Sequence, residues 1–217
     1  RPSDEIGRTA GLRAVERLNP RRPATGNYPV IYDERISSGL VGHFLSAING
    51  AAITRGSSWL KDSLGEQVLP RTCKLVENPH RLRAGASRLF DSEGLTTKKR
   101  EILSKGVLNG WTLDLASARK LGMRPTANAS RSVSSNPSPT NWNIELSSPE
   151  DYCDNLLSEI RNGLLVTSLI GSTINPNTGD YSRGVSGFWV EDGQICYPVS
   201  EITIAGNLKD MLKKIIL

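Results

Sequence analysis

The dipeptide Asp192-Gly193 lies between two apolar runs and constrains the fold more than any other local feature of the chain. The flanking runs cover residues 187–190 and 195–199, and Asp-Gly is preferred in the two-residue turn of a β-hairpin because the turn needs positive φ angles. An earlier apolar run, at residues 164–170, is followed by the turn-forming sequence NPNTGD at residues 175–180. Antiparallel strands are therefore predicted for this part of the chain.

The N-terminal part is predicted to hold helices and one strand. A first helix is indicated by apolar residues that recur every four positions, namely Ile6, Ala10, Ala14 and Leu18. Asn19-Pro20 ends it, because proline cannot continue a helix. A strand is expected at residues 28–32, and two further helices at residues 39–51 and 57–64.

The middle of the chain turns to strands. They are expected at residues 68–76 and 97–103, with a hairpin at residues 104–111 where turn formers alternate with apolar residues. Residues 124–141 are rich in Pro, Ser, Asn and Thr and show no periodicity. A loop of that length in a domain is usually functional or disordered, so we treat it as a candidate contact surface for a partner or substrate.

Two helices have recognisable ends. Asp114 is a good cap for a helix over residues 115–121, and Gly122 would end it. Ser148 followed by proline predicts a helix that continues to Arg161. The sum of these elements is an α+β fold, mainly antiparallel sheet with a few packed helices.

Composition narrows the setting in which this chain works. The net charge of +5 would permit nucleic-acid contact, but the basic residues form short groups among acidic neighbours, without interleaved aromatics, so we interpret them as solvated faces. No apolar run approaches the ~18 residues of a membrane span, and no membrane partner is predicted. The 3 cysteines are an odd number without close spacing, which favours a reducing, cytoplasmic location.

Four short stretches, in their order and spacing, carry a resemblance that covers nearly the whole chain. They are FDSEG at residues 90–94, GVLNG at 106–110, LGMRPTAN at 121–128 and DYSRGVSGFW at 180–189. Together they resemble the C-terminal part of the TldD/PmbA family, in particular its PmbA (TldE) branch. The chain begins at Arg1 rather than methionine. We expect a piece of a longer protein, with residues 1–22 as the end of a linking helical segment and residues 23–217 as the sheet-rich C-terminal domain, truncated at both ends.

The resemblance implies a role in proteolysis. The family is described as an intracellular metallopeptidase system in which a TldD-like subunit carries zinc and a PmbA-like subunit pairs with it. It has also carried the label "modulator of DNA gyrase". A TldD-like partner that holds the zinc, a peptide substrate and perhaps-formed homodimers are thus implied by resemblance, and no cofactor is expected in this chain itself.

Residues 37–43 (SSGLVGH) are the place where this expectation can be tested on single residues. TldD-like subunits carry His-Glu-x-x-x-His here, and the match places Ser38 and Gly39 at the His-Glu pair and His43 at the second histidine. Zinc proteolysis needs about three protein ligands and a carboxylate beside the bound water. A serine hydroxyl is a poor zinc ligand and glycine offers no base, so no catalytic or metal-binding residue is assigned. The further cysteine ligand of the family would fall beyond Leu217.

Other residues were weighed for chemistry and for a structural role. His43 is interpreted as packed or hydrogen-bonded against the sheet, and His80 as an exposed turn residue. Asp91 and Glu93 could form a carboxylate pair, although Asp-Ser-Glu-Gly is also a good turn. The glycines of GVSG at residues 184–187 match no phosphate-binding loop and indicate a bulge or close backbone packing.

An aromatic group near the C-terminal hairpins is a second candidate for contact with a peptide or partner. It comprises Tyr181, Phe188 and Trp189, with Tyr197 close by in the predicted sheet. Such residues belong most often to the core, but an edge strand rich in aromatics can also receive a peptide.

Three hypotheses follow from the sequence. The first is a non-catalytic PmbA/TldE-like subunit of an intracellular zinc metallopeptidase that acts on extended or unfolded peptides. The second is a divergent metallopeptidase that uses His43 with ligands from elsewhere. The third is a binding module for DNA gyrase or nucleic acid, for which salt-sensitive DNA affinity would be the mark.

Overall fold

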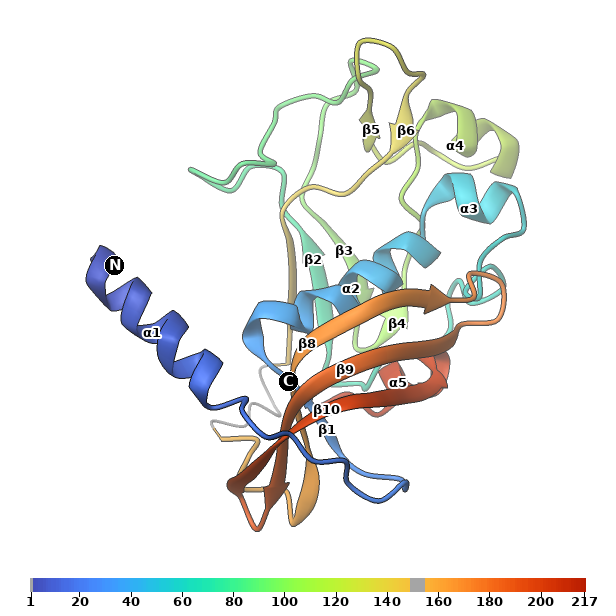
Figure 1. Cartoon of the computed structure of the whole chain (residues 1–217). Coiled ribbons are helices and arrows are strands. Elements are labelled where there is room, and N and C mark those ends of the chain that lie inside the picture. Colours follow the sequence, from blue (N-terminus) through green and yellow to red (C-terminus); the bar gives the residue numbers. More distant parts are fainter. Residues whose placement is uncertain (1, 149–154) are drawn as a thin grey trace. The chain divides into compact units, whose positions relative to one another are not determined.

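The computed structural model describes residues 2–148 and 155–217, and its elements group into two units (Figure 1). The first unit comprises residues 1–39, 153–173 and 181–205, and the second comprises residues 40–152, 174–180 and 206–217. Strands dominate both units and most neighbouring strands are antiparallel, so the predicted α+β class is confirmed. No helix within the described ranges has the length and apolar character needed to cross a bilayer.

The first unit is built on a four-stranded sheet in the order β1-β8-β9-β10. Its strands are β1 (Val30–Tyr32), β8 (Asn162–Ile174), β9 (Asp180–Glu191) and β10 (Gln194–Asn207), and the last three form the long adjacent arrows of Figure 1. Strand β1 runs parallel to β8, with Val30 opposite Leu164. The turn between β9 and β10 has positive φ at both Asp192 (45°) and Gly193 (77°), which confirms the predicted hairpin.

One face of this sheet carries the core of the first unit. Its buried members are Leu164, Val166, Val185, Trp189 and Val199, and partly buried apolar side chains from β1, β10 and the start of α2 pack against them. Alternate residues of a strand point to the same face, which is why these members are spaced by even numbers within each strand. The apolar runs seen in the sequence therefore form one continuous layer.

Helix α1 (Ser3–Val15) confirms the first predicted helix, although it ends before Asn19-Pro20. None of its residues is buried, and the large apolar side chains of Ile6 and Leu12 are more than half exposed. Its apolar stripe therefore packs against nothing in the part of the chain that the structure describes.

The predicted helix over residues 39–51 is two helices in the structure. Helix α2 (Glu34–Ala47) begins earlier than expected, and α3 (Gly50–Thr54) follows it directly. The interruption has a local cause, because the side chain of Asn49 accepts a hydrogen bond from the backbone N–H of Ala51 (2.9 Å) and so caps a new helix.

The second unit contains a four-stranded antiparallel sheet in the order β4-β3-β2-β7. Its strands are β2 (Lys74–Glu77), β3 (Arg100–Ser104), β4 (Val107–Leu108) and β7 (Ile144–Ser147). The predicted strands and the β3-β4 hairpin are present but shorter, and β7 was not predicted. Helix α4 (Leu115–Leu121) has the expected Asp114 cap and ends at Gly122 in the left-handed conformation, and α5 (Leu208–Lys213) follows β10.

Two predicted helices differ from the structure. Residues 57–64 form turns, because the buried hydroxyl of Ser58 donates to the Ala47 carbonyl (2.5 Å) and accepts from the Leu60 N–H (3.0 Å), which holds the chain in a tight turn. Of the helix predicted over residues 148–161, residues 149–154 lie outside the described ranges. Residues 155–159 are turns, and the Ser158 and Ile160 amides bond three residues back rather than four.

Candidate functional site

Helix α2 carries the positions that match the zinc motif of the family. Its first turn is fixed by Asp33, whose carbonyl accepts from the amides of Ile36 and Ser37 and whose carboxylate receives both Nε (2.7 Å) and Nη2 (3.0 Å) of Arg35. The Arg35 hydrogen bond holds the pKa of Asp33 below its ordinary value, despite an opposing effect of burial. A carboxylate so paired is fully ionised at neutral pH and strengthens the start of the helix.

The degenerate motif lies on consecutive turns of this helix. Ser38 is exposed, and Gly39 and His43 are half-buried. Five residues on an ideal α-helix correspond to a rotation of about 140°, so Ser38 and His43 point in clearly different directions. A Cβ atom added at Gly39 would meet no other atom within 4 Å. Packing therefore does not demand glycine at this position, and a carboxylate side chain would have had room.

These residues do not fit a zinc ion. One imidazole, one hydroxyl and a glycine supply a single good donor and no proton acceptor for a metal-bound water. Within residues 2–148 and 155–217, no three His, Cys, Asp or Glu side chains gather as a metal site requires. That the zinc belongs to another chain remains a prediction.

The second histidine has a structural position. His80 is exposed in a turn, where its backbone N–H donates to the Asn78 side chain (3.1 Å), and its Nε2 lies 3.1 Å from Oγ1 of Thr97. The prediction of an exposed turn residue is confirmed.

The aromatic residues proposed for peptide contact lie on β9. Tyr181 and Trp189 are 2% and 6% exposed, so the prediction that such residues form core is confirmed for these two. Trp189 packs edge-on against Tyr28, with ring centres 4.9 Å apart, and donates from Nε1 to Glu191 (2.9 Å). Phe188 is half-buried and points to the opposite face of the strand, and contact with a peptide stays a prediction.

Sequence reasoning gave no role to Arg183, although it stands inside the DYSRGVSGFW stretch. It is half-buried on β9, and its Nε atom is buried without a hydrogen-bond partner among the described residues. Nearby, the Tyr32 hydroxyl at the end of β1 donates to the Tyr181 hydroxyl (3.3 Å). Burial raises the pKa of Tyr32 well above its ordinary value, the contact with Tyr181 adds to this, and the charge of Arg183 opposes it.

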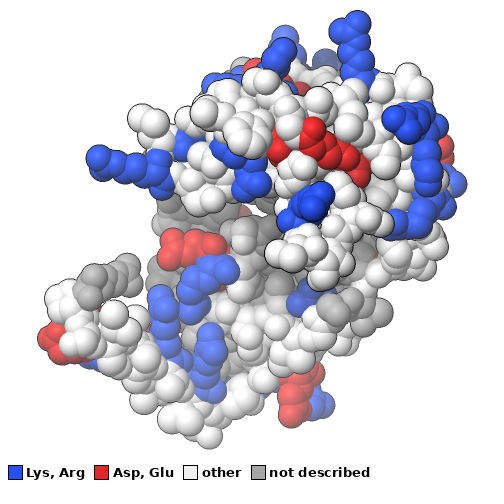
Figure 2. Space-filling view, turned by 90° about the horizontal axis from the view of Figure 1, so that it is seen from above, with Lys and Arg blue, Asp and Glu red and all other residues white. Residues whose placement is uncertain are grey.

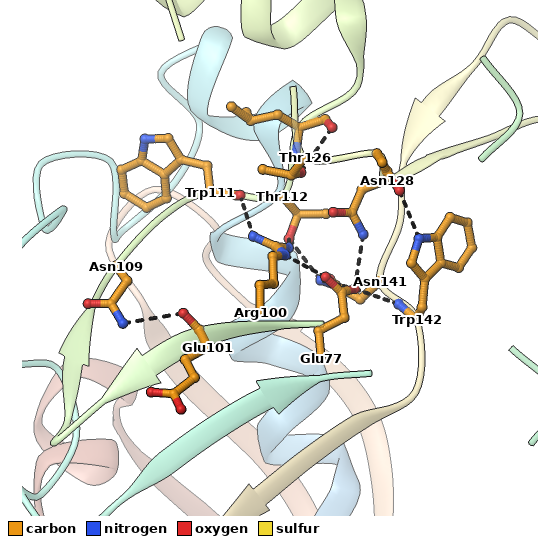
Figure 3. Close-up of polar contacts among 12 residues, drawn as sticks. Glu77, Arg100, Glu101, Asn109, Trp111, Thr112, Thr126, Asn128, Asn141 and Trp142 are labelled. Atoms are coloured by element: carbon orange, nitrogen blue, oxygen red, sulfur yellow. Dashed lines mark hydrogen bonds and ion pairs between the residues drawn. The ribbon is translucent and has the colours of Figure 1, made fainter. Parts of the chain in front are cut away.

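A buried polar network joins the sheet of the second unit to the loop that sequence analysis singled out (Figure 3). Glu77 on β2 is 1% exposed, and its Oε2 accepts from Nε of Arg100 (2.5 Å) on β3. The other oxygen, Oε1, accepts from the side chains of Asn128 (2.9 Å) and Asn141 (3.2 Å) and from the Trp142 amide (2.6 Å). Every polar atom of this carboxylate is thus engaged, as a buried charge requires.

The network explains why residues 124–141 are held in place. Within them, β5 (Ala129–Ser130) and β6 (Ser138–Pro139) pair as a small antiparallel hairpin. Asn128 is fully buried and also donates to the Thr140 carbonyl (2.7 Å), which joins the two ends of the hairpin. The outer part, residues 131–136, is exposed. Contact of this tip with a partner or substrate remains a prediction.

The FDSEG stretch is a turn, as its sequence predicted. Oδ1 of Asp91 accepts from the amides of Glu93 (2.9 Å) and Leu95 (3.0 Å), and Oδ2 accepts from the Ala129 amide (3.0 Å). Glu93 accepts from the Leu115 amide (2.8 Å) at the start of α4. Each carboxylate therefore stabilises backbone N–H groups and not the other in an acid–base pair.

Gly187 in the GVSG stretch confirms the prediction of close backbone packing. A Cβ atom there would lie 1.9 Å from the Leu165 carbonyl oxygen on the neighbouring strand β8. No side chain fits in that space, so the glycine is required by the sheet.

Basic side chains are dispersed over the face shown in Figure 2. Lys and Arg form separate groups there, with Asp and Glu between several of them. This face shows no continuous basic stripe of the kind that tracks a nucleic-acid backbone.

With this geometry in view, comparison with known proteins identifies the family. A family model described as "PmbA/TldA metallopeptidase C-terminal domain" matches residues 25–217. The chain is 44% identical to "Metalloprotease PmbA" of Escherichia coli O157:H7 over 97% of its own length and 45% of that protein. It therefore spans about half the length of the curated relatives that it matches.

Two crystal structures share the fold. One is of a candidate modulator of a DNA gyrase from Thermotoga maritima, with a TM-score of 0.86 and 32% identity over 100% of this chain and 50% of that one. The other is TldE from Thermococcus kodakarensis, with a TM-score of 0.82 and 22% identity over 97% of this chain and 48% of that one. The resemblance inferred from the sequence is confirmed, and the chain belongs to the PmbA/TldA metallopeptidase C-terminal domain family.

Proposed function

We propose that this chain is part of a non-catalytic PmbA/TldE-like subunit of a cytoplasmic zinc metallopeptidase, and that a TldD-like subunit supplies the zinc ion and the general base. The observation that carries the proposal is the donor set of α2. Ser38 and Gly39 occupy the motif positions where the TldD-like pattern has a ligand and a base, and His43 alone retains a metal-binding group.

The chemistry of the missing groups is what separates a catalytic from a supporting chain. A zinc peptidase holds its ion with about three protein donors and needs a carboxylate to take the proton of the attacking water. The space at Gly39 is open, so the absence of that carboxylate has no steric cause. A subunit relieved of catalysis has no need of either group, which is what this helix presents.

The sheet of the first unit supports a role in handling extended peptides. Strand β10 is the outermost strand, and along its outer side the described residues make one isolated bridge, between Arg21 and Val199. The rest of this edge offers backbone N–H and C=O groups to an added strand. A peptide bound in this way contributes its main chain, so the substrate class would be unfolded or extended chains of varied sequence.

The names of the relatives agree with this reading at the level of the family. The Escherichia coli relative is named a metalloprotease, and that name covers a protein about twice as long as this chain. A subunit that is essential to a protease complex without holding its metal would be consistent with both the family and the residues on α2.

The test is reconstitution of peptide hydrolysis from purified subunits. The full-length protein is mixed with a TldD-like subunit of the same source, and cleavage of an unfolded peptide is followed with His43→Ala and, as a matched control, His80→Ala. Both variants should support cleavage as well as the unchanged protein, because neither histidine holds the metal. Cleavage by this protein alone, lost in His43→Ala but kept in His80→Ala, would instead identify a divergent metallopeptidase.

A further inference from the structure

Arg183 and Tyr32 form a polar cluster at the margin of the core of the first unit. Tyr32 is the last residue of β1 and lies opposite Val166 of β8, and Arg183 stands two residues beyond Tyr181 on β9. Residues two apart on a strand share a face, so Arg183 and Tyr181 point to the same side of the sheet. The Tyr32–Tyr181 hydrogen bond, at 3.3 Å, brings the end of β1 to that side as well.

The guanidinium of Arg183 lacks an acidic partner among the described residues. Four ion pairs occur in that part of the chain, and none includes Arg183. The carboxylate next to Tyr32 in sequence, Asp33, is already held by two hydrogen bonds from Arg35. A buried Nε–H without an acceptor is costly, and natural structures keep such groups where an ion or ligand completes them.

Tyr32 adds a neutral hydroxyl to this positive charge. Burial is the main cause that raises its pKa, so the phenol keeps its proton throughout the physiological range. The cluster therefore consists of one cation and phenol O–H groups, with no negative charge supplied by the described residues. This combination suits a planar anion, because guanidinium binds carboxylates through two parallel N–H groups and a phenol adds a third donor.

We propose that Arg183 and Tyr32 form a binding site for a carboxylate of the peptide substrate. The proposal deepens the function proposed above and rests on it for the nature of the ligand, since an extended peptide carries a carboxylate at its C-terminus or on an Asp or Glu side chain. Engagement of the terminal carboxylate would orient the chain on the sheet without reading its sequence. The charged site thus complements main-chain recognition at a strand edge.

Binding by the full-length protein without any partner subunit tests the site directly. The probes are a short acetylated alanine peptide with a free C-terminus, the same peptide as its amide, and the amide with aspartate as its last residue, each titrated by calorimetry. The free acid should bind at least about tenfold more tightly than the amide, as a charge-assisted hydrogen bond predicts. The aspartyl amide separates the two sources of carboxylate, because equal binding to the free acid would mean that a side chain serves as well as a terminus.

The variants assign the preference to named residues. Arg183→Gln should abolish the difference between acid and amide, and Tyr32→Phe should reduce it a fewfold. Arg22→Gln is the matched control, since Arg22 is exposed on the same unit and paired with Glu201, and it should keep the full preference. Arg183→Lys retains the charge without the planar fork, so it should keep part of the preference even if Arg183→Gln proves poorly folded.

Equal affinity of the unchanged protein for acid and amide would overturn the proposal, as would a preference that survives in a folded Arg183→Gln variant. Failure of the proposed function would look different. If the protein discriminates the acid from the amide but supports no hydrolysis with a TldD-like subunit, the carboxylate site stands and the subunit role falls.

Discussion

Oε2 of Glu77 lies 2.5 Å from Nε of Arg100, inside the second unit and across the pair of strands β2 and β3. Removal of one member would leave the other charge buried and uncompensated. We therefore expect Glu77→Ala to lower the free energy of unfolding by about 3–5 kcal/mol, measured by urea denaturation.

A surface ion pair on the same two strands provides the control. Nζ of Lys74 lies 2.6 Å from Oε1 of Glu101, but both side chains are close to half exposed. Glu101→Ala should change the free energy of unfolding by no more than about 1 kcal/mol, because solvent screens the pair. Similar losses in the two variants would contradict the structural role given to the Glu77 network.

Gly42 on α2 should be replaceable with a gain in stability. It is exposed, it lies inside a helix, and a Cβ atom there would meet nothing within 4 Å. Gly42→Ala should raise the free energy of unfolding by about 0.5–1 kcal/mol, because alanine loses less backbone entropy on folding.

Gly187 supplies the opposite case. Since its added Cβ would lie 1.9 Å from a backbone oxygen of β8, Gly187→Ala should destabilise the protein by at least about 1–3 kcal/mol, the range for overpacked sites. Thermal melts of the two alanine variants, run side by side, check both signs. A destabilised Gly42→Ala variant would mean that the helix has a contact at this position that the structure lacks.

Tyr32 should make the fold sensitive to alkali. Its pKa is raised in the folded state, so the unfolded chain loses this proton first, near the ordinary tyrosine value of about 10. The stabilisation is fully present below that pH and is lost as the pH rises beyond it, by about 1.4 kcal/mol per pH unit for one group. Tyr32→Phe should flatten the decline between about pH 10 and 11, measured by urea denaturation at each pH. An unchanged slope would show that Tyr32 ionises normally in the folded protein.

The tip of the β5-β6 hairpin should be dispensable for folding. Residues 131–136 are exposed, and the side chain of Val133 packs against nothing. Replacement of residues 132–136 by Asn-Gly should change the free energy of unfolding by less than about 0.5 kcal/mol, whereas Asn128→Ala at the base should cost about 1–3 kcal/mol. If the shortened protein also forms the complex and supports peptide cleavage unchanged, the tip has no part in partner or substrate contact.

Local signals in the sequence were enough to predict some elements correctly. The Asp192-Gly193 hairpin and helix α4 between Asp114 and Gly122 depend on residues that are neighbours in the chain, and both are present as expected. Their hydrogen bonds close within a few residues, so a sequence pattern contains nearly all the information needed.

Elements that depend on distant residues were missed or misread. Residues 57–64 have a helix-like pattern, but the Ser58 hydroxyl bonds to Ala47, 11 residues earlier, and this contact favours turns. The Glu77 network joins residues up to 65 positions apart, so no local pattern could reveal it. Arg183 was visible only as part of a family motif, and its buried, unpartnered Nε atom is a property of the folded sheet.

The most direct measurement is the zinc content of the purified full-length protein, by elemental analysis after dialysis without chelator. We expect close to no zinc on this protein alone and about one zinc ion per pair once it is mixed with a zinc-loaded TldD-like subunit, with the same values for His43→Ala. About one zinc ion per chain in the isolated protein, lost in His43→Ala and kept in His80→Ala, would contradict the non-catalytic role and show that α2 still holds a metal.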